Sequence, residues 1–188
     1  MNSLIIMSCS AKKGRVAAPA INLYQGVMYS TFRANAPRTW PAVVILSARH
    51  GFIDVGRVIE PYEQRMTVAR AGEMIAELAA FDSIEWPSGV RSILLAGGKT
   101  YQMVMRAAIE RRIKIGLLNP DIIIEQTSGG IGYQRAQLGS FLRSLAQDGV
   151  SLDIENYCTL SSFFIISGFF GNVIFWMLRR SCGDIEHR

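Results

Sequence analysis

The sequence predicts an α/β protein with a mostly parallel sheet, helices on both faces of that sheet, and a hydrophobic C-terminal helix. Short apolar runs alternate along the chain with segments of helical periodicity. Strands that are apolar throughout are typical of parallel sheets buried on both faces. With 188 residues, 49% of them hydrophobic and 19% charged, the chain is too apolar to be disordered and long enough to bury a core.

Three apolar runs are the expected parallel strands: residues 4–8, 43–47 and 92–96. Each run stops at a polar or glycine-containing turn, which is typical of a strand that ends at a loop. Residues 113–118 and 121–125, on either side of Pro120, are two shorter strand candidates.

Helices are expected in the intervals between these strands. Apolar residues recur at helical spacing over residues 19–37, between two prolines, and residues 71–81 also predict a helix. Residues 101–108 carry apolar side chains at i, i+3, i+4 and i+7, and a last helix is expected over 133–146. Residues 52–65 are predicted to be irregular, because the residue before Pro61 favours an extended conformation.

The C-terminal segment differs from the rest, so residues 1–150 are expected to form the α/β domain and residues 151–188 a hydrophobic tail. Residues 156–178 carry no charge, and the 19 residues 160–178 include five Phe and three Ile. That length just spans a bilayer, and Trp176 with the following arginine pair suits a membrane interface. A buried terminal helix, an oligomer interface and a non-native tail are the alternatives.

Charge and cysteine usage narrow the class of protein. Residues 1–150 hold 17 basic and 11 acidic residues, a net charge of about +6, which is compatible with polyanionic partners or with an ordinary basic surface. Two histidines and three cysteines without paired spacing predict no metal site, no disulfide framework and no cofactor. No signal peptide is evident, so a cytoplasmic protein is expected, with membrane association possible only through the tail.

The chemistry is expected in the loops that follow the strands, because sites of parallel sheets form at the carboxyl ends of strands. The first such loop contains Cys9, Ser10, Lys12 and Lys13. Nearby cations lower a thiol pKa, so Cys9 could be an activated nucleophile with His50 as its base. The loop could instead bind an anion, or simply end the strand around a small buried cysteine.

Two further loops carry candidate groups. Arg49 suits bidentate contact with phosphate or carboxylate, and His50 could transfer a proton or be a structural histidine. Glu60, Tyr62 and Arg65 lie within six residues of one another, and a carboxylate beside a polar acid is what glycosidic cleavage requires. The alternative is a polar loop in which Glu60 and Arg65 pair with each other or with water.

Glycine-rich turns precede two of the expected helices. They contain Gly97, Gly98 and Lys99 in one case and Gly130 and Gly132 in the other. Glycine lets the backbone approach an anion at a helix N-terminus, although neither turn has P-loop or Rossmann spacing, and structural turns of this kind are common.

The order of these motifs resembles the YaaA-like family of small bacterial and phage proteins. The motifs are Cys9-Ser10-x-x-Lys13, Leu23-Tyr24-x-Gly26-x-x-Tyr29, Leu46-Ser47-Ala48-x-x-Gly51, Glu60-Pro61-Tyr62-x-x-Arg65-Met66 and Gly130-Ile131-Gly132-Tyr133-Gln134. The first motif is also similar to the Cys-Ser-x-x-Lys domain of archaeosine synthase. The resemblance covers about residues 3–145 and departs from the pattern at Ala48-Arg49-His50.

The resemblance implies a protein that processes nucleic-acid bases, as an N-glycosidase or a deazaguanine-type transglycosylase. Lys13, Glu60 and Tyr62 would then be the catalytic residues: Glu60 as acid or nucleophile, Tyr62 stacking on a base, and Lys13 with Arg65 holding phosphate. A non-catalytic DNA-binding protein of the oxidative-stress response and a membrane-anchored nucleotide-sensing effector are the alternatives. The expected partner is a nucleic acid, nucleotide or base, with membrane or oligomer contact through residues 160–178.

Overall fold

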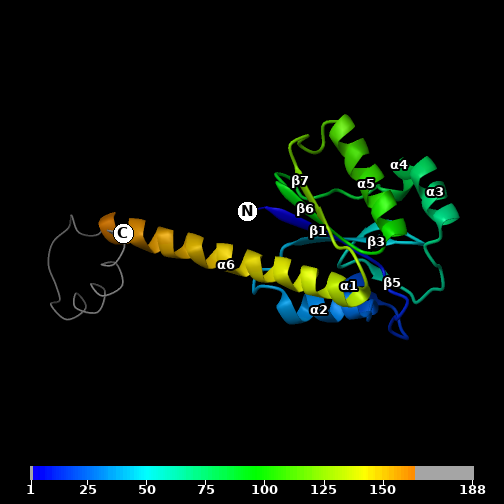
Figure 1. The fold of residues 1–188 in the computed structure, drawn as a ribbon, viewed down its shortest axis with the longest axis horizontal. Coiled ribbons are helices and arrows are strands. Elements are labelled where there is room, and N and C mark those ends of the chain that lie inside the picture. Colours follow the sequence, from blue (N-terminus) through cyan, green and yellow to red (C-terminus); the bar gives the residue numbers. More distant parts are fainter. Residues whose placement is uncertain (1, 164–188) are drawn as a thin grey trace. The chain divides into compact units, whose positions relative to one another are not determined.

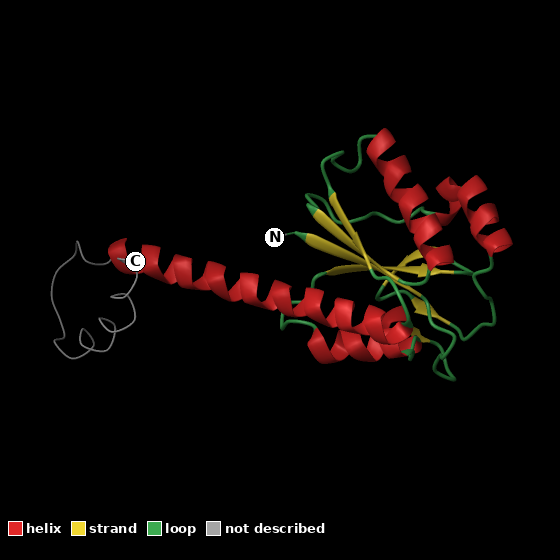
Figure 2. Ribbon diagram, viewed as in Figure 1, coloured by secondary structure: helices red, strands yellow, loops and turns green. Residues whose placement is uncertain are grey.

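The protein has the predicted α/β architecture, with a mostly parallel central sheet between two layers of helices (Figures 1 and 2). The computed structural model describes the backbone of residues 2–163 and the side-chain surroundings of residues 2–147. The chain divides into two units, Met1–Gly149 and Val150–Arg188, and the first of them contains the sheet. The tail predicted over 151–188 lies outside the described residues from residue 164 onward.

Five strands form the main sheet in the order β4-β3-β1-β6-β7. Their bounds are Ser3–Ser8 (β1), Ala42–Ser47 (β3), Gly51–Asp54 (β4), Ser92–Ala96 (β6) and Ile123–Gln126 (β7). Strands β1, β3, β6 and β7 are parallel, and only β4 is antiparallel to its neighbour β3. In register, Ile5 of β1 lies between Val43 of β3 and Leu94 of β6. A second, two-stranded sheet pairs β2 (Ala18–Pro19) with β5 (Val58–Ile59).

Alternate residues of the central strand β1 face two different cores. Ile5 and Met7 lie in a core shared with helices α1 (Ala20–Leu23), α2 (Val27–Asn35) and the first part of α6 (Ile131–Phe163). Figure 1 shows these three helices on one side of the sheet. Because a strand with both faces covered has no solvent side, the four residues between the terminal serines of β1 are all apolar.

The opposite core contains Leu4 and Ile6 of β1 and the apolar sides of three other helices. These are α3 (Val68–Ala76), α4 (Leu78–Phe81) and α5 (Lys99–Lys114). Thr67 caps α3 by accepting a hydrogen bond from the backbone N–H of Arg70. Both faces of the sheet are thus covered by helices, as the sequence predicted.

Three expectations about individual elements are wrong. Residues 52–65 are not irregular throughout, because β4 returns beside β3 as a hairpin and β5 pairs with β2. Residues 113–118 are not a strand: α5 continues to Lys114, and Gly116, with a φ of +75°, ends the helix. The helix expected over 19–37 is two helices, broken at Tyr24–Gly26.

Within the described residues, no helix has the length and apolar composition needed to cross a bilayer.

Candidate functional site

Three of the predicted loops meet at the carboxyl edge of the sheet, because β1, β3 and β6 run parallel and side by side. Cys9 follows β1, Ala48 follows β3 and Gly97 follows β6. The loop between β5 and α3 crosses to the same region and carries Tyr62, which lies in the core beside Cys9 and Ala48. This edge is the candidate site.

Tyr62 is the centre of a chain of buried hydroxyl groups. Its Oη lies 2.7 Å from the Tyr24 Oη and 2.7 Å from the Ser47 Oγ. Ser47 Oγ accepts hydrogen bonds from the backbone N–H groups of Arg49 and His50. Because a hydroxyl has two acceptor positions and one hydrogen, Ser47 then donates its hydrogen to Tyr62. In the bond between Tyr62 and Tyr24 either hydroxyl can be the donor. The chain fixes the turn after β3 and the ring of Tyr62 together.

Cationic side chains surround the ring of Tyr62. Lys13 Nζ lies 4.4 Å from the ring centroid and the Arg49 guanidinium carbon lies 5.8 Å from it. The imidazole of His50 is edge-on to the same ring, with 5.1 Å between the ring centroids. No carboxylate of residues 2–147 forms an ion pair with any of these three side chains. Lys13 and Arg49 therefore place positive charge beside the ring without a direct ion-pair partner among residues 2–147.

The pKa of His50 is lowered by burial and by nearby positive charges. Partial burial lowers its pKa, and the charges of Arg57 and then Arg49 lower it further. Both neighbouring charges disfavour a third cation beside them. Arg57, on the turn between β4 and β5, is a member of this cluster that the sequence did not indicate, because only the return of β4 brings it near His50.

The loop after β1 is held by its own hydrogen bonds. Ser10 Oγ accepts from the backbone N–H of Gly26 at 3.1 Å and donates to the carbonyl of Lys12. Lys13 pairs with Tyr24 in an isolated antiparallel bridge, which directs the chain back over Tyr62. Ser10 therefore fixes the conformation of this loop through its hydrogen bonds. Lys12 is exposed to solvent, and Lys13 contacts the ring of Tyr62.

Cys9 is 9% exposed, and its polar partner is not the one predicted. Its Sγ lies 3.0 Å from the hydroxyl of Tyr101 on α5, whereas the imidazole of His50 contacts Tyr62. Burial and then Cys9 raise the pKa of Tyr101, so the phenol stays neutral at physiological pH. Among the residues whose side chains are described, no histidine hydrogen-bonds to Cys9, as the base of an activated thiol nucleophile would.

Glu60 and Arg65 do not join the cluster. Both side chains are exposed, and in the part of the chain whose side chains are described no hydrogen bond or ion pair involves Glu60. Tyr62, by contrast, is only 5% exposed, so its ring does not offer a free face to a stacked base. In this arrangement Glu60 and Lys13 form no ion pair, and the buried ring of Tyr62 would have to be uncovered before a base could stack on it.

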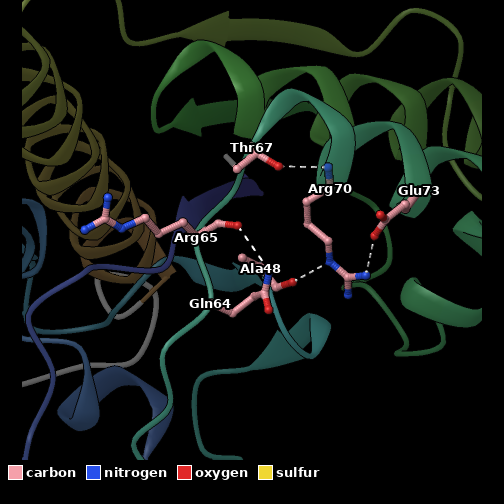
Figure 3. Close-up of polar contacts among 6 residues, drawn as sticks. All are labelled: Ala48, Gln64, Arg65, Thr67, Arg70 and Glu73. Carbon is pink, nitrogen blue, oxygen red and sulfur yellow. Dashed lines mark hydrogen bonds and ion pairs between the residues drawn. The ribbon is translucent and has the colours of Figure 1, made fainter.

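Figure 3 shows how the segment around Arg65 is anchored. Arg70 Nε donates to the carbonyl of Ala48 at 2.9 Å, and Arg70 Nη1 pairs with Glu73 at 3.0 Å. The side chain of Arg65 extends away from this pair. Arg70 thus ties α3 to the turn that carries Arg49 and His50, and it is a positioning residue that the sequence did not indicate.

The glycine-rich turns divide into a buried and an exposed part. Gly97 is buried: its N–H bonds to Thr127 Oγ1, and its carbonyl accepts from Gln102 Nε2 at 2.7 Å. A Cβ at Gly97 would lie 2.8 Å from the side chain of Ser8, so the glycine is required by close packing of β6 on β1. Its amide is therefore not available to a phosphate. The remaining predicted residues of these turns are exposed: Gly98, Lys99, Gly130 and Gly132.

Within the described residues, no group of three His, Cys, Asp or Glu side chains is placed to hold a metal ion. A cavity of about 590 Å³ lies between α5, β6 and β7 and is lined by residues such as Val90, Arg91 and Leu118. Those residues flank the amino ends of β6 and β7, so this cavity is separate from the candidate site.

Comparison with known proteins identifies the family of the chain. No curated protein matches the chain. A crystal structure described as that of AF0587, a protein of unknown function, is similar with a TM-score of 0.43 and 11% sequence identity. The similarity covers 76% of this chain and 44% of that one, so the chain spans less than half the length of that protein.

The model of a family of unknown function, DUF6884, matches residues 4–115. That match includes β1 through α5 and all of the cationic cluster, and the chain therefore belongs to the DUF6884 family.

Proposed function

We propose that the protein binds nucleic acid at the carboxyl edge of its sheet, with ligand phosphates held by Lys13, Arg49 and Arg57. The observation that carries the proposal is the group of cations around Tyr62 that has no carboxylate partner among residues 2–147. Arginine suits bidentate phosphate contact and lysine supplies a point charge. The net charge of about +6 on residues 1–150 and the motif order that resembles nucleic-acid-processing families also support it.

Salt dependence of binding tests this proposal. A full-length protein titrated with a fluorescein-labelled single-stranded DNA should lose affinity as salt rises, with a slope of about −0.7 per phosphate contacted. The variants Lys13→Gln and Arg49→Gln should each reduce the slope by roughly one contact. Arg38→Gln is the matched control, because Arg38 is an exposed cation that precedes β3, at the opposite edge of the sheet. Equal slopes in all four proteins would contradict the proposal.

Base processing is a second candidate, and one observation favours it. Glu60 is an exposed carboxylate two residues before Tyr62, and it forms no ion pair within residues 2–147. A carboxylate free of a protein cation can act on a developing positive charge at an anomeric carbon. Release of free base from DNA or tRNA by the wild type, and its loss in Glu60→Gln, is the expected result. Glu63→Gln removes an exposed carboxylate of the same loop and should keep the activity. Unchanged base release in Glu60→Gln would remove Glu60 from the mechanism.

A further inference from the structure

His50 differs from the cations Lys13, Arg49 and Arg57 because its charge can change near neutral pH. Its backbone N–H donates to Ser47 Oγ at 3.0 Å, so the turn that carries it is fixed. Its imidazole packs edge-on against Tyr62, whose own position is fixed by Tyr24 and Ser47. The backbone hydrogen bond and the ring contact therefore place His50 beside the proposed phosphate site.

We infer that His50 takes up a proton when a phosphate group binds beside Arg49 and Arg57, so that affinity for phosphate-bearing ligands rises as the pH falls. This inference rests on the proposed function, since it concerns the same site. Beyond phosphate binding itself, the inference assigns the uptake of one proton by His50 to the binding step.

The positive charges near His50 disfavour its protonation in the free protein. Arg57 and Arg49 are the charged groups that act on the imidazole, the ring of Tyr62 covers its side, and Lys13 lies over the same ring. Without an anion, protonation would add another positive charge to this group, and partial burial disfavours the imidazolium as well. A phosphate reverses the balance because its negative charge favours the imidazolium, which can also donate a hydrogen bond to it.

The direction of the pH effect follows from linkage. In the free protein the pKa of His50 lies below its ordinary value of 6.5, so the imidazole is neutral at pH 7. Bound phosphate raises that pKa, so the complex holds up to one more proton than the free protein. Between the two pKa values, affinity should therefore rise by at most about tenfold for each unit that the pH falls, and outside that window it should be flat.

Nuclear magnetic resonance of the full-length protein tests proton uptake directly. The chain has two histidines, His50 and His187, and the His50→Gln variant assigns their signals. The His50 titration should have a midpoint below 6.5 without ligand, and inorganic pyrophosphate should shift that midpoint upward. An unchanged midpoint in saturating pyrophosphate would overturn the inference.

Binding of the labelled single-stranded DNA at several pH values between about 5 and 8 supplies the second readout. The wild type should bind more tightly at the acidic end, His50→Gln weakly with little pH dependence, and His50→Lys tightly with little pH dependence. Arg38→Gln should keep the wild-type pH profile. An equal pH dependence in wild type and His50→Gln would also overturn the inference.

The two readouts separate this inference from the proposed function. DNA binding without a shift of the His50 midpoint would leave the proposed function standing and reject proton uptake. A pyrophosphate-induced shift without DNA binding would support a proton-linked anion site and reject nucleic acid as its ligand.

Discussion

Tyr62 links the hydroxyl chain of the core to the cations of the edge. Its hydroxyl bonds to Tyr24 and Ser47, both fully buried, while its ring contacts Lys13 and Arg49. In Tyr62→Phe the ring stays and the hydroxyl is lost, so we expect a loss of about 1–3 kcal/mol in the free energy of unfolding. DNA affinity should change by less than tenfold.

The matched variant is Tyr62→Leu, which also removes the ring that orients the cations and should weaken DNA binding as well as stability. Urea unfolding and fluorescence anisotropy measure the two effects. A Tyr62→Phe protein as stable as the wild type would contradict the importance of the hydroxyl chain.

Gly51 is a second residue whose identity is fixed by its surroundings. Its φ is +73°, in the left-handed region, and a Cβ there would lie 2.2 Å from the carbonyl oxygen of Phe81. Gly51→Ala combines about 1–2 kcal/mol of backbone strain with a clash against main chain that must move. We expect a total destabilisation of at least about 2 kcal/mol by chemical denaturation. Gly56→Ala, where a Cβ meets nothing within 4 Å, should cost less than about 1 kcal/mol.

At the scale of elements, one buried ion pair joins α5 to the segment between α4 and β6. Arg112 donates to both carboxylate oxygens of Asp82 at 2.7 Å and to the carbonyl of Ile84, and it stacks on Trp86. Arg112→Met leaves the carboxylate of Asp82 buried without its cation, so we expect a loss of about 3–5 kcal/mol in unfolding free energy.

The double variant Asp82→Leu/Arg112→Met should be less destabilised than Arg112→Met, because it leaves no unpaired buried charge. Arg111→Met changes a neighbouring, more exposed arginine and should stay within about 0.5 kcal/mol of the wild type. A double-mutant cycle by denaturant unfolding measures the coupling. A double variant as unstable as the single one would show that packing, and not the charge of Asp82, sets the cost.

For the whole molecule, we expect the buried tyrosines to make stability depend on pH in the alkaline range. Burial raises the pKa of Tyr24 to about 12, and it raises the pKa values of Tyr29, Tyr62 and Tyr101 above 10 as well. The folded protein therefore keeps protons that the unfolded chain releases near pH 10. The stabilisation is fully present below pH 10 and is lost as the pH rises toward 12.

We accordingly expect cooperative alkaline unfolding in that range, with tyrosinate absorbance and circular dichroism changing together. Tyr24→Phe should make the fall in stability with pH less steep. Tyrosinate absorbance that develops fully before the circular dichroism changes would contradict the prediction.

Some elements and site residues could be predicted because their signal is local. The apolar runs of β1, β3 and β6 and the periodicity of α5 are visible in sequence, as are the loops that follow the strands. Strand β4 was missed because four residues beginning with glycine carry little strand signal, and pairing with β3 stabilises them. Residues 113–118 were predicted wrongly because Ile115 and Leu117 look like buried strand residues, although both are exposed after the helix ends.

The sequence by itself determined the α/β class and the edge of the sheet where polar loops gather, because both follow from the periodicity of short segments. Only the tertiary structure decided which side chains meet there. It placed Tyr62 in the core, paired Cys9 with Tyr101 and buried the amide of Gly97. It also brought Arg57 near His50 and left Glu60 in solvent. The physical reason is that burial, hydrogen-bond partners and the field of neighbouring charges depend on residues far apart in the chain, which spacing along the sequence does not specify.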